Sequence, residues 1–340
     1  MTQSTQEFAD ELVAPDAQGL PERFFDRFMF NLHPQDGGGP SIIAGAGIYP
    51  PRDIIDGFAV VTLADEQRNA RFSTALHAAP GGGVGPLTWR IVEPMRHWGI
   101  TFDDPELGVA FDLDWVARAP AWWGSVAVAN TDGTPSSFEH LFQSGLVTGT
   151  LAIDGAETAV DGWYSQRDRS RGVRTMTGGQ GLHIWFQAQF PDRSVGFLAV
   201  EDREHRLLQL EGAVMHTDGR LDPVVDVGHA LRFDEGLDLR EGVVTVVTGS
   251  GERLVLGADA SNRGGYMSGG GYGGAHGRDF GLDFLEHDAY ALDGSVSPRT
   301  VDTALTDRLT RFSWGGVPGS GIFEFAHSRS GSYRYAPRSV

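Results

Sequence analysis

A chain of 340 residues exceeds the usual size of a single hydrophobic core, so we expect two domains. The composition, 40% hydrophobic and 21% charged, is typical of a globular protein, and the lack of cysteine and lysine excludes disulfides, thiolate catalysis, Schiff-base chemistry and a P-loop lysine. The net charge of -18 repels phosphate groups, which argues against a nucleic acid or an anionic membrane as a partner.

The two ends of the chain carry the segments that most favour helix. Short terminal helices are predicted from Thr5 to Leu12 and from Val301 to Phe312, where Thr300 and Asp302 are suited to N-terminal capping. Residues 1–18 lack the basic flank and apolar run of a secretory signal, and no run elsewhere approaches the roughly 20 apolar residues of a membrane span. We therefore expect a cytoplasmic protein without a transmembrane segment.

Between the ends, short apolar runs alternate with turn signals, a pattern that predicts an all-β protein. Asp-Gly, the dipeptide best suited to a tight hairpin, begins at Asp36, Asp56, Asp132, Asp154, Asp161, Asp218 and Asp293. The runs that predict strands include residues 57–63, 146–153, 182–190, 195–200, 207–215 and 243–248. Regular turns of this kind are what a meander or a β-barrel needs.

Two features indicate where the chain divides. The Asp-Gly pairs at Asp154 and Asp161 bracket a polar connection, and the run 57–61 in the first half is echoed by residues 196–200 in the second. We therefore predict an N-terminal domain of residues 18–157 and a C-terminal domain of residues 158–337.

A glycine-rich stretch, residues 264–277, lacks the preceding strand and following helix of a dinucleotide-binding loop. It carries two aromatic residues, Tyr266 and Tyr272. Two interpretations are open: a mobile loop whose aromatic rings lie over the mouth of a cavity, or a solvent-exposed connection.

Two neighbouring segments, residues 161–174 and 181–190, hold most of the side chains suited to chemistry. If both are strands, alternate side chains share a face. In the first segment one face carries Trp163, Arg167, Arg169 and Arg171, and the other carries Tyr164, Asp168, Ser170 and Arg174. In the second, His183, Trp185, Gln187 and Gln189 lie opposite the apolar Leu182, Ile184, Phe186 and Phe190. The polar faces either line an aromatic-walled cavity in a small barrel or form the solvated outside of a sheet.

The first of these segments also resembles a known family. The string Gln166-Arg-Asp-Arg-Ser-Arg-Gly-Val-Arg174 is similar to the Asp-His-Ser/Asn-Trp-Gly signature of the carotenoid 1,2-hydratase (hydroxyneurosporene synthase) and AttH-like superfamily. Further similarity to the tandem-domain branch of unknown function in that group lies in residues 91–98, 140–149, 154–155 and 319–325. The similarity extends from about Phe24 to Tyr335.

The resemblance implies two consecutive lipocalin-like antiparallel β-barrel domains, the second carrying the Arg-Asp-Arg-Ser-Arg-Gly motif, and a hydrophobic small-molecule substrate. Characterised members hydrate isolated double bonds or promote cyclisations without a metal or organic cofactor, so the resemblance implies none here. The family's His and Trp are replaced by Arg169 and Arg171. Two guanidinium groups oppose a carbocation, and the neighbouring arginines favour a carboxylate at Asp168, which is either the acid or a structural partner of the arginines.

Arginines on an aromatic-walled face suit a ligand that carries a carboxylate, an enolate or another anionic oxygen. We therefore hypothesise a cofactor-independent hydratase, lyase, isomerase or cyclase that acts on a lipophilic molecule with a carbonyl or anionic head. His183 moves the proton, because its unperturbed pKa lies near neutrality, and Arg169 or Arg171 stabilises the oxyanion. The predicted substrate contacts are Trp163, Tyr164, Arg167, Trp185, Gln187 and Glu324.

Other interpretations stay open at this point. A non-catalytic lipocalin-like carrier of a hydrophobic ligand fits the replacement of the family's His and Trp, and a scaffold whose first barrel supports the second is a third candidate. A lone histidine on a strand is more often a structural residue, so His183 has that interpretation too, and Glu324 is also interpretable as a solvent-facing residue. The acidic residues between Asp279 and Asp288 lack a metal-binding spacing, so we predict no metal site. A homodimer is compatible with the sequence.

Overall fold

The computed structural model describes residues 10–129, 135–174, 180–262 and 264–340, and their strands form two antiparallel sheets. The strands of the first sheet are β1 (Phe24–His33), β2 (Ser41–Tyr49), β3 (Ile54–Thr62), β4 (Glu66–Ala75), β5 (Gly83–Val84), β6 (Leu87–Glu93), β7 (His97–Asp104), β8 (Val109–Ala117), β9 (Trp122–Ala129), β10 (Pro135–Ile153), β11 (Ala156–Val173) and β18 (Phe284–Ala291). The strands of the second are β12 (Gln180–Phe190), β13 (Arg193–Asp202), β14 (Leu207–His216), β15 (Leu221–Phe233), β16 (Leu239–Thr248), β17 (Arg253–Asp259), β19 (Thr306–Trp314) and β20 (Val317–His327). Two 3-10 turns, η1 (Pro50–Arg52) and η2 (Leu76–Ala78), follow β2 and β4.

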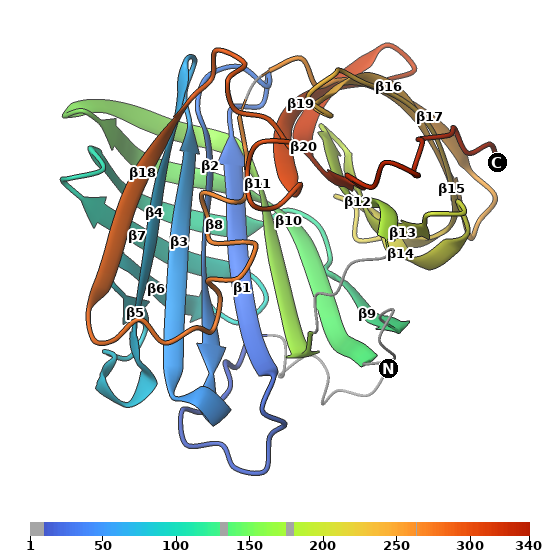
Figure 1. Cartoon of the computed structure of the whole chain (residues 1–340). Helices are drawn as coiled ribbons and strands as arrows, with labels where there is room; N and C mark the ends of the chain where they lie inside the picture. The colour runs from blue at the N-terminus through green and yellow to red at the C-terminus, as the bar shows by residue number, and fades with distance from the viewer. Residues whose placement is uncertain (1–9, 130–134, 175–179, 263) are drawn as a thin grey trace.

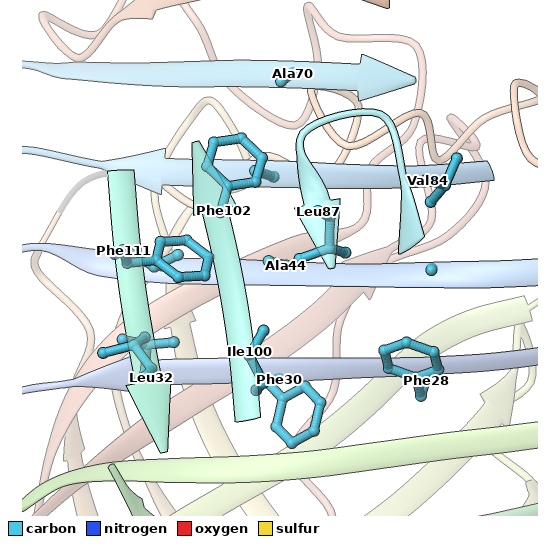
Figure 2. Packing of buried hydrophobic residues seen from close by; sticks show 14 of the residues in the cluster. Phe28, Phe30, Leu32, Ala44, Ala70, Val84, Leu87, Ile100, Phe102 and Phe111 are labelled. Atoms are coloured by element: carbon cyan, nitrogen blue, oxygen red, sulfur yellow. The ribbon is translucent and has the colours of Figure 1, made fainter. Parts of the chain in front are cut away.

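The first sheet has twelve strands in the order β18-β4-β3-β2-β1-β11-β10-β8-β7-β6-β5, with β9 paired to β10. It folds over itself, so that β1 to β4 lie in front of β5 to β8 (Figure 1). Aromatic and aliphatic side chains fill the space between these layers; Figure 2 shows Phe28 and Phe30 on β1 and, on the crossing strands, Ile100 next to Phe30 and Phe102 next to Phe111. Burial of this apolar surface drives the two halves of the sheet together.

The second sheet closes into an eight-stranded barrel in the order β12-β13-β14-β15-β16-β17-β19-β20 (Figure 1). Its interior is filled with buried apolar side chains, and the stacked rings of Phe186 and Phe197, 4.9 Å apart, lie in this core. Side chains therefore occupy the inside of this small barrel, as is usual for eight strands.

Strand pairing changes sheet between Val173 and Gln180. Strand β11 is the central partner of both β1 and β10, and β18, from the second half of the chain, returns to pair with β4. The Arg-Asp-Arg-Ser-Arg-Gly motif therefore lies in the first sheet. The division into residues 18–157 and 158–337 as independently folding domains stays a prediction.

The Asp-Gly pairs do not all form hairpin turns. Asp154 and Gly155, both with positive φ, make the tight turn between β10 and β11, as predicted. The turn predicted at Asp161 is wrong, because Gly162 instead has its positive φ inside β11, where the register shifts by one residue. A positive φ suits a β-bulge as well as a turn, so the dipeptide alone does not separate the two. Asp132 lies outside the described residues.

The predicted C-terminal helix is wrong. Thr306–Trp314 is β19, which pairs with β17 and β20 and so closes the barrel. Pairing on both edges and burial of most of the segment outweigh its helical capping signals. Most of the predicted helix Thr5–Leu12 lies outside the described residues, and Asp10–Leu12 are not helical. No helix in the described part of the chain is long and apolar enough to cross a membrane.

The glycine-rich stretch packs between the two sheets instead of forming an exposed connection. Tyr266 is buried, and its hydroxyl donates to Asp238 Oδ2 (2.8 Å). The backbone amide of Asp307 donates a hydrogen bond to the carbonyl oxygen of Gly265 (2.7 Å). Gly265 has a φ of +79°, and a Cβ at this position would lie 1.6 Å from the carbonyl oxygen of Asp307. Glycine is therefore required where the loop meets β19.

Candidate functional site

The polar face of β12 is the outside of the barrel, and the first sheet covers it. Leu182, Ile184, Phe186 and Phe190 belong to the barrel core, as alternation predicts. On the other face, Asn31 Nδ2 of β1 donates to Gln187 Oε1 (2.9 Å), and Ser144 Oγ of β10 donates to Gln189 Oε1 (2.5 Å). The face is thus neither the barrel interior nor solvated surface. We call the contact of β1, β10 and β11 with β12, β14, β19 and β20 the seam.

An apolar cluster lies at the seam, separate from the cores of the sheet and the barrel. Its members are Phe25, Met29, Ile43, Tyr49, Ile54, Phe58, Val60, Val126, Phe138, Trp185, Leu198, Val200, Met267 and Leu305. The ring of Tyr272, from the glycine-rich stretch, packs against this cluster and lies edge-on to Phe58, 5.7 Å away. Trp185, a predicted substrate contact, is part of the cluster, so the seam combines apolar walls with polar groups.

The two faces of β11 have different surroundings. Arg169 points into the core of the first sheet, where Nε and Nη2 donate to the two oxygens of Asp26 (2.9 and 2.8 Å). Arg167 pairs with Asp10 and lies over the ring of Trp98, 5.1 Å from its centroid. Both guanidinium groups are almost fully buried with these carboxylates. Their partners are residues of this chain, which explains two buried arginines without a ligand.

Three further predicted residues have distinct positions. Arg171, on the same face as Arg169, is partly buried and lies 5.8 Å from the ring centroid of Phe24, and Trp163 packs against the core of the first sheet. Tyr164, on the opposite face, lies under the guanidinium of Arg118 (4.7 Å), whose Nη2 donates to two barrel carbonyls. The structure therefore separates Arg169 and Arg171 from His183, which lies at the seam.

Asp168 reaches the barrel through a histidine. His140 Nε2 of β10 lies 2.5 Å from Asp168 Oδ2, and its Nδ1 contacts Glu211 Oε1 of β14. Burial by itself would lower the pKa of His140, but the charges of Asp168 and Glu211 and their hydrogen bonds raise it to about 10. His140 is therefore a cation at neutral pH that joins one carboxylate from each sheet. Asp168 Oδ1 receives no hydrogen bond from the described residues.

Two arginines lie next to this chain of charges. Arg27 Nη2 lies 3.2 Å from His276 Nε2, and Arg27 Cζ lies 5.0 Å from the ring centroid of Tyr272. The charge of Arg27 also interacts with Asp168. Burial and the charge of Arg27 lower the pKa of His276 to about 4, so this imidazole is neutral and accepts the hydrogen bond.

Arg174, the second of these arginines, lies at the end of β11. Its guanidinium stacks on Phe138 (4.5 Å) and interacts with the charges of Asp168 and Glu324. Burial lowers the pKa of Arg174 more than these carboxylates raise it. No carboxylate in the described part of the chain lies within salt-bridge distance of it. Its guanidinium is therefore available to an anionic group at the seam.

The remaining predicted residues, His183 and Glu324, are partners. His183 Nε2 lies 2.6 Å from Glu324 Oε1, and both side chains keep part of their surface accessible. The charge of Glu324 also interacts with Tyr272 and Arg174. The structure thus brings Asp168, His183, Trp185 and Glu324 to one side of the barrel, together with Arg27 and Arg174.

Sequence reasoning missed the roles of His140 and Glu211. His140 was noted as part of a family-like segment, and Glu211 is a single carboxylate in the strand-forming run 207–215. An isolated charge inside an apolar strand is the signal that marks such a position. Arg27, one residue after the buried Asp26, carries the same signal in β1.

A groove of about 630 Å³ lies on the barrel, and Arg232, Val243 and Arg311 are among its lining residues. We give it no role, because it is open and mostly apolar in lining, and the converging charges lie elsewhere. Among the described residues, no three His, Asp or Glu side chains are arranged to hold a metal ion. Glu286 and Asp288 of the acidic stretch instead pair with Arg71.

Comparison with solved structures identifies the class of fold. Similar structures are an AttH-like protein of Nitrosomonas europaea (TM-score 0.58, 10% identity, 95% of this chain and 100% of that chain), kievitone hydratase of Nectria haematococca (0.54, 12%, 93% and 93%) and CghA with Sch210972 (0.52, 10%, 94% and 94%). The chain therefore has the fold of these proteins, which confirms the all-β class and, at the level of the fold, the predicted resemblance to AttH-like proteins. Residues 9–329 match a family of unknown function, DUF8625, and the chain belongs to that family. No curated protein matches the sequence.

Proposed function

We propose that the protein is an enzyme of the hydratase, isomerase or cyclase type that binds a lipophilic carbonyl compound at the seam. The observation that carries this proposal is the chain Glu211–His140–Asp168, a buried cation held between two carboxylates, with a free oxygen of Asp168 beside Arg27 and Arg174. Strongly perturbed ionisable groups cluster at catalytic sites more often than at purely structural ones. The similarity to a hydratase and to CghA supports the same class.

In this proposal Asp168 is the base. The cationic His140 holds its Oδ2, which leaves Oδ1 to accept a proton from water or from the carbon next to a carbonyl group. Arg27 and Arg174 stabilise the negative charge that then develops on the carbonyl oxygen, since guanidinium groups in a partly desolvated site interact strongly with an oxyanion. All of these groups are side chains of the chain itself, so the proposal needs no cofactor.

The substrate class follows from the walls of the seam. Met29, Phe138, Trp185 and Tyr272 offer apolar and aromatic surface to a lipophilic body, while the two arginines favour an oxygen with partial or full negative charge. Arg169 and Arg171, the oxyanion groups expected from the sequence, lie on the other face of β11 and have no part in this proposal.

The test is conversion and retention of a compound from a lipid extract of the source cells. We expect the wild-type protein to bind and convert a carbonyl compound, Asp168→Asn to bind it without converting it, and Arg174→Met to bind it more weakly, measured by native mass spectrometry and by chromatography of the extract. Arg171→Met, on the opposite face of the same strand, is the matched control and should behave as wild type. A ligand returned unchanged by the wild type indicates a carrier instead, and no retained ligand refutes both functions.

A further inference from the structure

A second carboxylate pair lies across the seam from Asp168. Asp307 of β19 and Glu324 of β20 are direct cross-strand partners, so their side chains share one face of the sheet. Trp185 is the partner of Glu324 on its other side, which places this face at the seam. The charge of Asp307 interacts with Asp168 and Tyr272, so the two carboxylate sites are neighbours.

The surroundings of Asp307 do not suit an ionised carboxylate. Its side chain is 1% exposed, and neither carboxylate oxygen has a hydrogen-bond donor among the described residues. A buried carboxylate without a donor or a cation is strongly disfavoured, and such a group takes up a proton instead. Glu324 differs, because His183 Nε2 lies 2.6 Å from its Oε1.

Burial and the neighbouring carboxylates all raise the pKa of Asp307. Burial raises the pKa of Asp307 well above its usual range, and the negative charges of Glu324 and Asp168 raise it further. Arg174 interacts with Asp168 and Glu324, and Tyr272 of the glycine-rich stretch is a neutral phenol at neutral pH because burial raises its pKa to about 12. Two neighbouring carboxyl groups in one buried site cannot both ionise, so one proton stays on the pair.

We propose that Asp307 is the proton donor of the site, carrying a proton that it shares with Glu324 and delivering it to the substrate opposite the base Asp168. This inference rests on the proposed function. Two carboxyl groups whose surroundings separate their protonation states are suited to act as an acid and a base in one reaction.

The hydration of an α,β-unsaturated ketone shows where each proton and electron pair would go in such a reaction. The oxygen of water forms a bond to the β-carbon and gives its proton to Asp168, while the π electrons move to the carbonyl oxygen as an enolate. The enolate then forms a C–H bond at the α-carbon with the proton of Asp307, whose O–H bond breaks. One water has been added, Asp168 has gained a proton and Asp307 has lost one, and exchange with solvent restores both. His183, partly accessible and bound to Glu324, offers the return route to Asp307.

The first test is infrared spectroscopy of the full chain at pH 8. A protonated carboxyl group has a carbonyl band separate from that of carboxylates, and this band shifts on exchange into heavy water. We expect the band in the wild type and its loss in Asp307→Asn, while Asp279→Asn, which removes an exposed carboxylate, keeps it. In Glu324→Gln the amide donates a hydrogen bond to Asp307, so the pH at which the band disappears should fall by about one unit or more. A wild type without the band, or a Glu324→Gln variant with unchanged titration, overturns the proposal.

The second test uses the compound that the extract assay shows to be converted. Asp307→Asn should lower kcat by roughly 100-fold or more with little change in KM, because general acid catalysis contributes to the transition state and not to ground-state binding. An undiminished kcat overturns the donor role alone and leaves the proposed function standing. If the wild type converts nothing, the proposed function and the donor role both fail, and the infrared band then reports on the proton of Asp307 alone.

Discussion

Replacement of Arg169 by methionine should destabilise the protein strongly while leaving the seam intact. Its guanidinium makes two hydrogen bonds to Asp26, at 2.9 and 2.8 Å, and both side chains are almost completely buried. Methionine keeps much of the side-chain volume but removes both of these donors from the carboxylate of Asp26, which keeps the hydrogen bond from the backbone amide of Val13. Removing one partner of a buried ion pair costs about 3–5 kcal/mol, so we expect a loss of that size in the free energy of unfolding.

The assay is urea denaturation followed by the fluorescence of tryptophan, with Trp98 and Trp115 buried in the affected core. Arg206→Met is the control, since the ion pair of Arg206 with Asp202 leaves the arginine mostly exposed and we expect no measurable change. The double variant Arg169→Met with Asp26→Leu should regain much of the lost stability, because no buried charge is then left unpaired. An Arg169→Met variant that loses less than about 1 kcal/mol would refute the structural role of Arg169.

Three other perturbations follow from the same contacts. The pKa of His140 is about 10 in the folded protein against roughly 6.5 in the unfolded chain, so its stabilising contribution is complete below pH 6.5 and is lost as the pH rises towards 10. In this window the free energy of unfolding of the wild type should fall, relative to that of His140→Gln, by roughly 1.4 kcal/mol per pH unit. Parallel curves of the two proteins against pH would contradict this prediction. Gly265→Ala should lower the melting temperature more than Gly281→Ala, because both have positive φ but only the former would meet Asp307; equal shifts would speak against the close approach. Phe186→Ala, in the barrel core, should cost about 3–5 kcal/mol in urea titrations, and a smaller cost would indicate that the interior relaxes.

The local pattern of the sequence was sufficient to predict the positions of many strands. The run 182–190 is most of β12 and the run 207–215 is most of β14, because alternating apolar residues and turn dipeptides depend on local geometry. The helix predicted from Val301 to Phe312 failed because the segment pairs with β20, which follows it, and with β17, more than 50 residues upstream; the pairing with β17 cannot be seen in the local pattern.

The candidate site required more than the pattern of β11. Periodicity correctly divided its side chains into two faces but could not say what each face meets. The arginine face meets Asp10 and Asp26, about 150 residues earlier in the chain, and becomes a buried structural network. The face with Asp168 meets a histidine of β10 and, through it, a carboxylate of the barrel. Motif similarity singled out the strand that carries the candidate site, whereas the face of this strand that meets the barrel depends on how the sheet folds over its own core.

The position of the proposed chemistry is a consequence of how each β unit satisfies its own core. The barrel fills its interior with Phe186, Phe197 and their neighbours, and apolar side chains of the first sheet fill the space between its layers. Polar strand faces that remain must then be covered from outside, and β12 is covered by β1 and β10. At one end, amides and hydroxyls pair directly; at the other, Arg174 has no carboxylate within salt-bridge distance among the described residues, and Asp307 has only the neighbouring carboxyl group of Glu324. A lipophilic ligand with a polar oxygen would complete that end of the seam, which is why retention of such a compound and protonation of Asp307 test one physical argument from two directions.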